Sequence, residues 1–244
     1  RLGSNEGIVS SLKSIATVYD SWGQYDKAIE NHQQALAIHR KLGREKYSAD
    51  DLEHIGFVYY FRGQYDKAME NFQQALAIRR KVGKEEGIAE SLIDIGKVYN
   101  SWGQYDKAIE NHQQALTLYK KLGKENGIAS SLTNIGFVYD SQGQYDKAIE
   151  NHQQALAIAR KVGREDRVAT SLNSIGHAYE YWGQHDKAIE NFQQGLAIVR
   201  RLGTKHKIAA FLGNIGEVYY GQQQYVPAIK HLVESIEIKE KLRK

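Results

Sequence analysis

Apolar residues recur along this chain at the three- and four-residue spacings that give a helix one buried side. Residues 125–141 carry one such series and residues 146–162 carry a second, with polar residues between the apolar ones. Gly143 lies between the two series and Gly163 follows the second, and glycine readily adopts the left-handed conformation that ends a helix. The pattern therefore predicts two helices, over about 125–141 and 146–162, with Asp146 as the cap of the second.

This helix pair repeats every 40 residues. The sequence GQYDKAIENHQQALAI occupies residues 23–38 and returns at residues 143–158, and close variants begin at residues 63, 103 and 183. A looser sixth copy, QQYVPAIKHLVESIEI, occupies residues 223–238. A fixed period of this length is typical of proteins whose units stack on their neighbours. We expect one array of six helix pairs, with approximate bounds 5–43, 44–83, 84–123, 124–163, 164–203 and 204–244.

Small residues occupy fixed positions inside both helices of the unit. Gly136 lies in the middle of a first helix, where glycine costs about 1 kcal/mol relative to alanine. The equivalent positions hold Ala16, Gly56, Gly96, Gly176 and Gly216, and one position of the second helix holds Ala28, Ala68, Ala108, Ala148, Ala188 and Ala228. Because such a glycine weakens its own helix, we expect a close approach between helices at these positions.

Composition and charge exclude several other classes of protein. The chain of 244 residues is 41% hydrophobic and 25% charged and has no cysteine, so it carries no disulfide and no thiolate metal site. Its apolar runs are too short for a membrane span and no signal peptide opens it, so we expect a cytoplasmic protein with no membrane partner. The net charge of +4 is small and the two signs are interspersed, which disfavours nucleic acid as the partner.

The repeat resembles the tetratricopeptide repeat. The resemblance covers essentially the whole chain and rests on the spacing of Leu12, Ile15, Ala16, Tyr19, Gly23, Tyr25, Ala28, His32 and Ala35. Two departures are the length of 40 rather than about 34 residues and the lack of the usual proline near the end of the unit. The longer unit is similar to the subtype in spindle-orientation adaptors and kinesin light chains. The resemblance implies an all-α, right-handed solenoid of six stacked helix-turn-helix repeats, whose first helices line a concave groove for extended peptides.

The two ends of the chain differ from the other units. Residues 1–3 occupy the frame of residues 41–43, which predicts the last turn of a preceding second helix and a chain that is a fragment of a longer array or protein. In the sixth unit Gln223 replaces the glycine, and Val233 and Ile236 make the second helix more apolar. The sixth unit therefore suits either a further packed element or self-association through the terminal repeats.

Variation among the units marks a candidate site. The second helix scarcely changes across the first five units, whereas the first helix varies along positions spaced four and three residues apart, which share one side of a helix. By the resemblance, that stripe faces the groove, where asparagine offers both a donor and an acceptor to a peptide backbone. The candidate peptide-binding residues are Lys13, Thr17, Asp20, Glu53, Phe57, Tyr60, Lys97, Asn100, Asn134, Phe137, Asp140, Asn173, His177, Glu180, Asn214, Glu217 and Tyr220.

Other interpretations of single positions stay open. Exposed positions also drift after duplication, although exposed aromatic residues are unfavourable without a partner. A row of basic residues, Lys41, Lys81, Lys121, Lys161 and Arg201, suits the carboxyl ends of the second helices and is also a candidate surface for an acidic partner or nucleic acid. Trp22, Trp102 and Trp182 suit packing beside the turn, with a role in binding as the alternative.

The sequence favours a binding protein over an enzyme. His32, His112 and His152 occupy a slot that the family fills with an aromatic residue, so we expect packing and no metal ligand. We find no nucleophile, base and orienting group that the repeat would bring together, and we expect no cofactor. The function predicted is a non-catalytic scaffold for a protein or extended peptide. The alternative is a sensor or regulatory segment of a larger signalling ATPase or enzyme.

Overall fold

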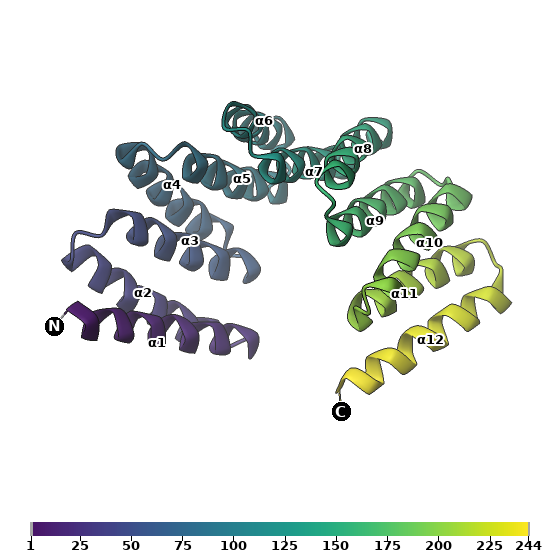
Figure 1. The fold of residues 1–244 in the computed structure, drawn as a ribbon, viewed down its shortest axis with the longest axis horizontal. Coiled ribbons are helices and arrows are strands. Elements are labelled where there is room, and N and C mark those ends of the chain that lie inside the picture. Colours follow the sequence, from purple (N-terminus) through teal and green to yellow (C-terminus); the bar gives the residue numbers. More distant parts are fainter. Residues whose placement is uncertain (1, 244) are drawn as a thin grey trace. The chain divides into compact units, whose positions relative to one another are not determined.

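The computed structural model describes residues 2–243, and every secondary-structure element in that range is an α-helix (Figure 1). The helices are α1 (Leu2–Ser21), α2 (Tyr25–Lys41), α3 (Glu45–Phe61), α4 (Tyr65–Val82), α5 (Glu85–Ser101), α6 (Tyr105–Lys121), α7 (Glu125–Ser141), α8 (Tyr145–Lys161), α9 (Glu165–Tyr181), α10 (His185–Arg201), α11 (Lys205–Gly221) and α12 (Tyr225–Arg243). None of these helices has the length and apolar character that crossing a bilayer requires.

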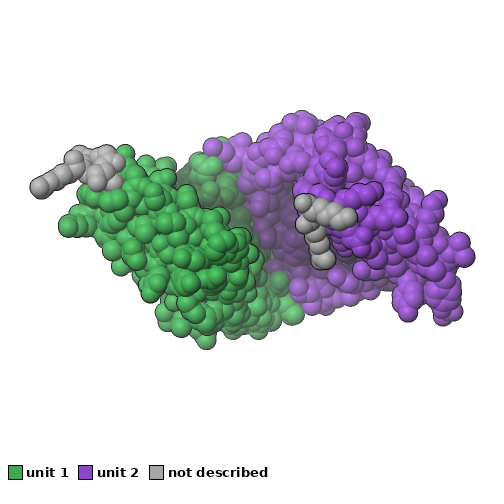
Figure 2. Space-filling view, turned by 90° about the horizontal axis from the view of Figure 1, so that it is seen from below, with its two compact units in different colours: residues 1–122 green, residues 123–244 purple. Residues whose placement is uncertain are grey.

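The helices belong to two compact units, residues 1–122 and residues 123–244, which Figure 2 colours green and purple. In the first unit α1 packs against α2, α3 against α4 and α5 against α6, so that each odd-numbered helix forms a hairpin with the next helix. The hairpins stack through the contacts of α2 with α3 and of α4 with α5. The second unit repeats this order from α7 to α12. The predicted all-helical arrangement of six helix pairs is confirmed.

Each hairpin turn ends on a residue with positive φ. Gly143, in the turn between α7 and α8, has φ 71°, and Gly163, after α8, has φ 72°, as the sequence predicts. The last hairpin keeps this geometry with Gln223 at φ 61°, although a side chain is unfavourable there. The turn is therefore imposed by the packing of α11 on α12 and does not depend on glycine alone.

Two details of the helix ends differ from the sequence prediction. Asp146 was expected to cap α8, but Gln144 holds the N-cap position without a side-chain hydrogen bond, and Asp146 lies in the first turn. There its negative charge favours the positive end of the helix dipole. Leu2 and Gly3 were assigned to the end of a preceding helix, but both belong to α1. The helical hydrogen bonds of α1 continue through them, because helix propagation needs no partner helix once a nucleus exists. Arg1 lies outside the described residues.

The mid-helix glycines lie directly under a large side chain of the partner helix. A Cβ atom built on Gly136 would lie 2.5 Å from the His152 ring, and one on Gly176 would lie 2.4 Å from the Phe192 ring. Gly56 with Phe72, Gly96 with His112 and Gly216 with Leu232 repeat the contact. The close approach predicted from these glycines is confirmed, and the histidines at this slot fill the same space as phenylalanine.

The contact between successive hairpins is apolar and also follows the 40-residue period. In the first unit Ala28, Ile29 and Leu36 of α2 pack with four residues of α3, which are Ala49, Leu52, Ile55 and Val58. In the second unit the equivalent side chains of α10 pack with those of α11, which are Ala188, Ile189 and Leu196 against Ala209, Leu212, Ile215 and Val218. The core of each unit is therefore a row of the same two contacts.

We predict that Gly136→Leu lowers the melting temperature by several degrees. The new side chain would need the space that the His152 ring occupies, and overpacking of this kind costs about 1–3 kcal/mol. Thermal unfolding followed by circular dichroism measures the change. Gly221→Ala is the control, because a Cβ atom on Gly221 meets nothing within 4 Å and its melt should stay within a degree or so of the wild type. Equal melts for Gly136→Leu and wild type would contradict the packing argument.

Candidate protein interaction surface

In the first unit, candidate residues on adjacent first helices reach one another. The Nζ of Lys13 lies 2.7 Å from Oδ1 of Asp51, which joins α1 to α3. The Nζ of Lys97 on α5 lies 5.3 Å from the centre of the Phe57 ring on α3, and the Tyr60 hydroxyl lies 3.0 Å from Ser101 Oγ. These contacts show that the predicted stripe forms a continuous row of side chains from α1 to α5.

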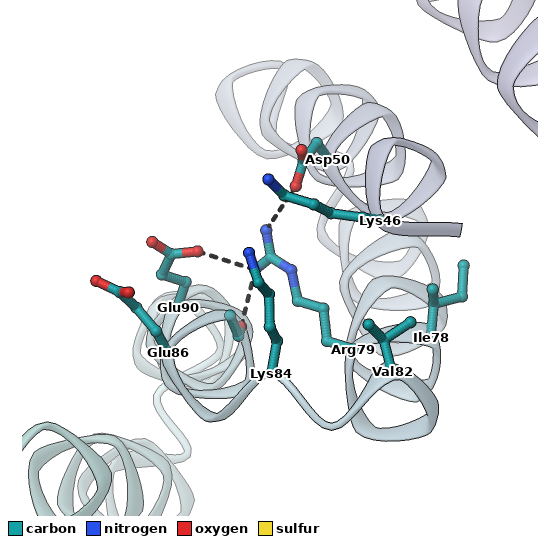
Figure 3. A pocket seen from close by; sticks show the side chains of 9 residues that line it. Lys46, Asp50, Ile78, Arg79, Val82, Lys84, Glu86 and Glu90 are labelled. Atoms are coloured by element: carbon teal, nitrogen blue, oxygen red, sulfur yellow. Dashed lines mark hydrogen bonds and ion pairs between the residues drawn. The ribbon is translucent and has the colours of Figure 1, made fainter. Parts of the chain in front are cut away.

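Glu53 differs from the other candidate residues because it lies in a buried ion pair. Arg79 of α4 donates to both carboxylate oxygens of Glu53, and its Nη2 lies 2.7 Å from Oε2. The same guanidinium lies 3.1 Å from Asp50, donates to the Gly87 carbonyl at 2.8 Å and lies 3.4 Å from Glu90. Figure 3 shows Arg79 between these helices. Glu53 therefore joins α3 to α4 and is not free to meet a ligand.

The local sequence explains this cluster. The position of Arg79 holds His39, Tyr119, Ala159 and Val199 in other units, so only the second unit of the repeat places a guanidinium there. Gly87 leaves room for it, because a Cβ atom at that position would lie 2.9 Å from Cδ of Arg79. Burial alone would lower the pKa of Arg79, but Glu53 and Asp50 outweigh it and raise the pKa above its usual value. A cavity of about 290 Å³ opens beside the guanidinium, lined by side chains of both charges.

In the second unit three candidate residues form a hydrogen-bonded row. The amide nitrogen of Asn214 on α11 donates to Oδ1 of Asn173 on α9 at 2.9 Å and lies 3.2 Å from Nε2 of His177. With Nε2 as the acceptor, the imidazole proton lies on Nδ1, which is 3.0 Å from the carboxylate of Glu180. The row fixes the orientation of both asparagine side chains.

A pocket of about 300 Å³ lies beside this row. It is lined by Thr170, Asn173, His177, Lys207, Ala210, Phe211 and Asn214. Its volume is at the lower end of the range for ligand pockets, which suits one side chain of a partner better than a large cofactor. Polar amides and one ammonium group face apolar Ala210 and Phe211 across it, so it offers both kinds of contact.

The remaining candidate residues are placed less uniformly. Asn134 donates to the Ser130 carbonyl of its own helix at 2.8 Å and therefore does not join the asparagine row. Phe137 is 44% exposed and packs edge-on against His152, whose Nε2 lies 3.1 Å from Asp140. Thr17 and Glu217 are exposed, Tyr220 is exposed beside Tyr225, and Asp20 and Asn100 are half-buried.

The row of basic residues at the ends of the second helices is paired with acidic residues. Lys161 lies 2.7 Å from Glu125 and Arg201 lies 2.5 Å from Glu165, in each case the first residue of the same hairpin. Lys81 with Glu45 and Lys121 with Glu85 repeat the pair. Exposed pairs of this kind contribute little stability, but they reduce the positive potential that would attract a phosphate backbone.

The buried histidines serve packing in this structure. His112 and His152 are buried under glycine, and burial lowers the pKa of His112 to about 4. Over residues 2–243 no three side chains of histidine, aspartate or glutamate are grouped as a metal ion would require.

Sequence reasoning missed the residues that complete each cluster. Lys207 and Phe211 line the pocket of the second unit, and Arg79 holds the cluster of the first. A signal existed for Arg79 and Lys207, because both positions vary strongly between units that are otherwise nearly identical. Neither lies on the stripe that the prediction followed.

The comparisons with known proteins agree with this architecture. A family model described as tetratricopeptide repeat matches residues 49–121, 127–201 and 183–241, and a second model with the same description matches residues 11–46. No curated protein matches this sequence significantly.

Several solved structures share the fold. BtubC from P. vanneervenii is 19% identical, with a TM-score of 0.77 over 90% of this chain and 92% of that chain. A Rap protein complexed with competence and sporulation factor is 19% identical, with a TM-score of 0.73 over 97% and 76%. Nearly identical TPR-like repeats of a kinesin light chain from Podosopora anserina are 25% identical, with a TM-score of 0.64 over 80% and 96%. The similarity to kinesin light chains expected from the sequence is confirmed.

We predict that His112→Phe makes the protein less sensitive to acid. Because the folded-state pKa of His112 is about 4 and the unfolded value is about 6.5, the unfolded chain binds the extra proton first. Stability is therefore lost as the pH falls from 6.5 to 4, by about 2 kcal/mol at pH 5. Phenylalanine fits, since Phe72 and Phe192 fill the same slot. Urea unfolding at several pH values measures the effect, and parallel curves for both proteins would contradict it.

We predict that Arg79→Val destabilises the first unit by about 3 kcal/mol, because Glu53 would remain buried without its cation. The double variant Arg79→Val with Glu53→Ile should recover most of the loss, since valine and isoleucine occupy the equivalent positions at Val199 and Ile93. Thermal and urea unfolding of both variants give the comparison. Equal losses in the single and double variants would show that the ion pair is not the cause.

Proposed function

Because the chain belongs to the tetratricopeptide-repeat family, we propose that it is a protein-interaction scaffold that receives an extended peptide segment on the first helices of its second unit. The observation that carries the proposal is the row of Asn173, His177 and Asn214 beside a pocket. Three polar side chains from two hairpins are held in one orientation without any ligand, which lowers the entropy cost of binding one.

The free atoms of the row match a peptide group. The amide nitrogen of Asn214 is used within the row, which leaves its Oδ1 as an acceptor, and the Oδ1 of Asn173 is used, which leaves its amide nitrogen as a donor. Within residues 2–243 no partner is recorded for these two atoms. One acceptor and one donor side by side are what the N–H and C=O of an extended backbone require.

The pocket would add specificity. Lys207 supplies a positive charge at its rim, so an acidic or amide side chain is the complementary group, and Ala210 and Phe211 would contact its methylene carbons. The Rap protein with the same fold is complexed with competence and sporulation factor, which supports a ligand role for this fold.

A displayed library of random peptides tests the proposal. The library is selected on the purified chain, and enriched peptides are synthesised with a fluorophore and titrated by anisotropy. We predict that Asn173→Ala with Asn214→Ala weakens binding at least about tenfold, since two backbone hydrogen bonds are lost, while the melt is little changed.

Asn191→Ala is the matched control, because the Asn191 amide donates only to the Lys187 carbonyl of its own helix at 2.8 Å, and its affinity should equal that of the wild type. Failure to enrich any peptide, or enriched peptides that bind both proteins equally well, would reject the proposed surface.

A further inference from the structure

The last helix exposes an apolar stripe. Ile229 is 62% exposed and Ile236 is 54% exposed, and Val226 and Val233 lie on the same side of α12. At the other end of the chain, α1 exposes Ile15 and Val18, which are 44% and 45% accessible. Each stripe lies at the edge of its unit, since α1 packs on α2 and α12 packs on α11 (Figure 1).

The 40-residue period shows what each stripe is shaped to contact. Ile229 and Ile236 are equivalent to Ile29 and Leu36 of α2, which are buried against α3. Ile15 and Val18 are equivalent to Ile55 and Val58 of α3, which form the other half of that contact. The second unit gives the same result independently, because α10 covers α11 with the equivalent residues. The stripe on α12 is therefore one half of a junction that the structure contains, and the stripe on α1 is the other half.

We propose that α12 of one copy packs on α1 of a second copy, so that copies of this chain associate head to tail through an additional hairpin junction. The two stripes are complementary to each other rather than to themselves. The association is heterologous, and it leaves a free stripe at each end of the assembly. It grows by adding copies and does not stop at a symmetric dimer.

One substitution at the edge of the junction supports this pairing. At the internal junctions of each unit the second helix places an aspartate opposite the residue before the turn, as Asp186 does beside Gln222 at 3.2 Å. In α12 that position is Val226, 83% exposed, and the opposing residue in the second copy is Trp22, 67% exposed. Trp102, which has a preceding hairpin, is only half-buried by comparison. The terminal junction thus replaces a polar contact with an apolar one, which favours burial of both ends together.

Light scattering coupled to size exclusion, over a wide range of protein concentration, tests the proposal. The wild-type chain of residues 1–244 is expected to show an average mass that rises continuously with concentration and persists at high salt, since the contact is apolar. A constant monomer mass at every concentration overturns the proposal. A mass that stops at the dimer also overturns it.

Blocking variants identify the two surfaces. Ile229→Glu with Ile236→Glu blocks α12, and Ile15→Glu with Val18→Glu blocks α1. Each variant should be monomeric alone and should weaken self-association about a hundredfold or more. An equimolar mixture of the two should form a 1:1 heterodimer, because one free α12 stripe meets one free α1 stripe. Dimers of either variant alone, or no heterodimer in the mixture, overturn the head-to-tail geometry.

Two controls separate association from damage to the fold. Lys230→Glu with Lys241→Glu places the same charges on exposed positions of α12 outside the stripe and should associate as the wild type does. Circular dichroism melts of the blocked variants should match the wild type, because the substituted side chains are half or more exposed.

Discussion

The contact between a glycine in the middle of each first helix and the side chain above it sets the distance between the two helices of a hairpin. In four hairpins the side chain is a phenylalanine or histidine ring, and in the last it is Leu232. Because the backbone of the first helix lies against the ring, the alanines of the second helix are also drawn into full burial. The hairpin is then a rigid body whose outer sides are available for other contacts. Stacking between hairpins and the arrangement of polar residues on the first helices both follow from that rigidity.

Nearly identical hairpins need not have identical interiors. Where α8 and α10 place Ala159 and Val199 under the next hairpin, α4 places Arg79, which is held by carboxylates of two helices and by the carbonyl of Gly87. In the same unit, His39 of α2 lies 2.5 Å from the buried carboxylate of Asp51, which also meets Lys13. Buried charges of this kind are costly to leave unpaired, so each fixes the neighbour that it accepts. The order of hairpins in the first unit is therefore specified by polar pairs, and in the second unit chiefly by apolar packing.

Two kinds of surface remain after the hairpins have stacked, and they differ in chemistry. The first helices of the second unit present amide groups whose hydrogen bonds are only half used, which suits a polar, extended ligand. The outer sides of α1 and α12 present aliphatic residues in the pattern that the interior uses, which suits another hairpin of the same kind. One scaffold can therefore offer a ligand surface and a separate association surface, and a change in one does not alter the other.

The sequence by itself determined the helices and their pairing, because both rest on local rules. The apolar period and the glycines with positive φ located α7 and α8 to within a residue, and the repeated glycines announced the close approach that the structure contains. Local rules did not determine which residue would cap α8, or that Leu2 and Gly3 would continue α1.

Only the tertiary structure decided the use of each polar side chain. Glu53 and Asn134 occupy positions much like those of other candidates, yet Glu53 pairs with Arg79 and Asn134 bonds its own helix, while Asn214 meets Asn173, 41 residues away. A polar group on a helix has several partners within reach. Which one it takes depends on what the neighbouring hairpin places opposite it, and that information lies outside any single repeat.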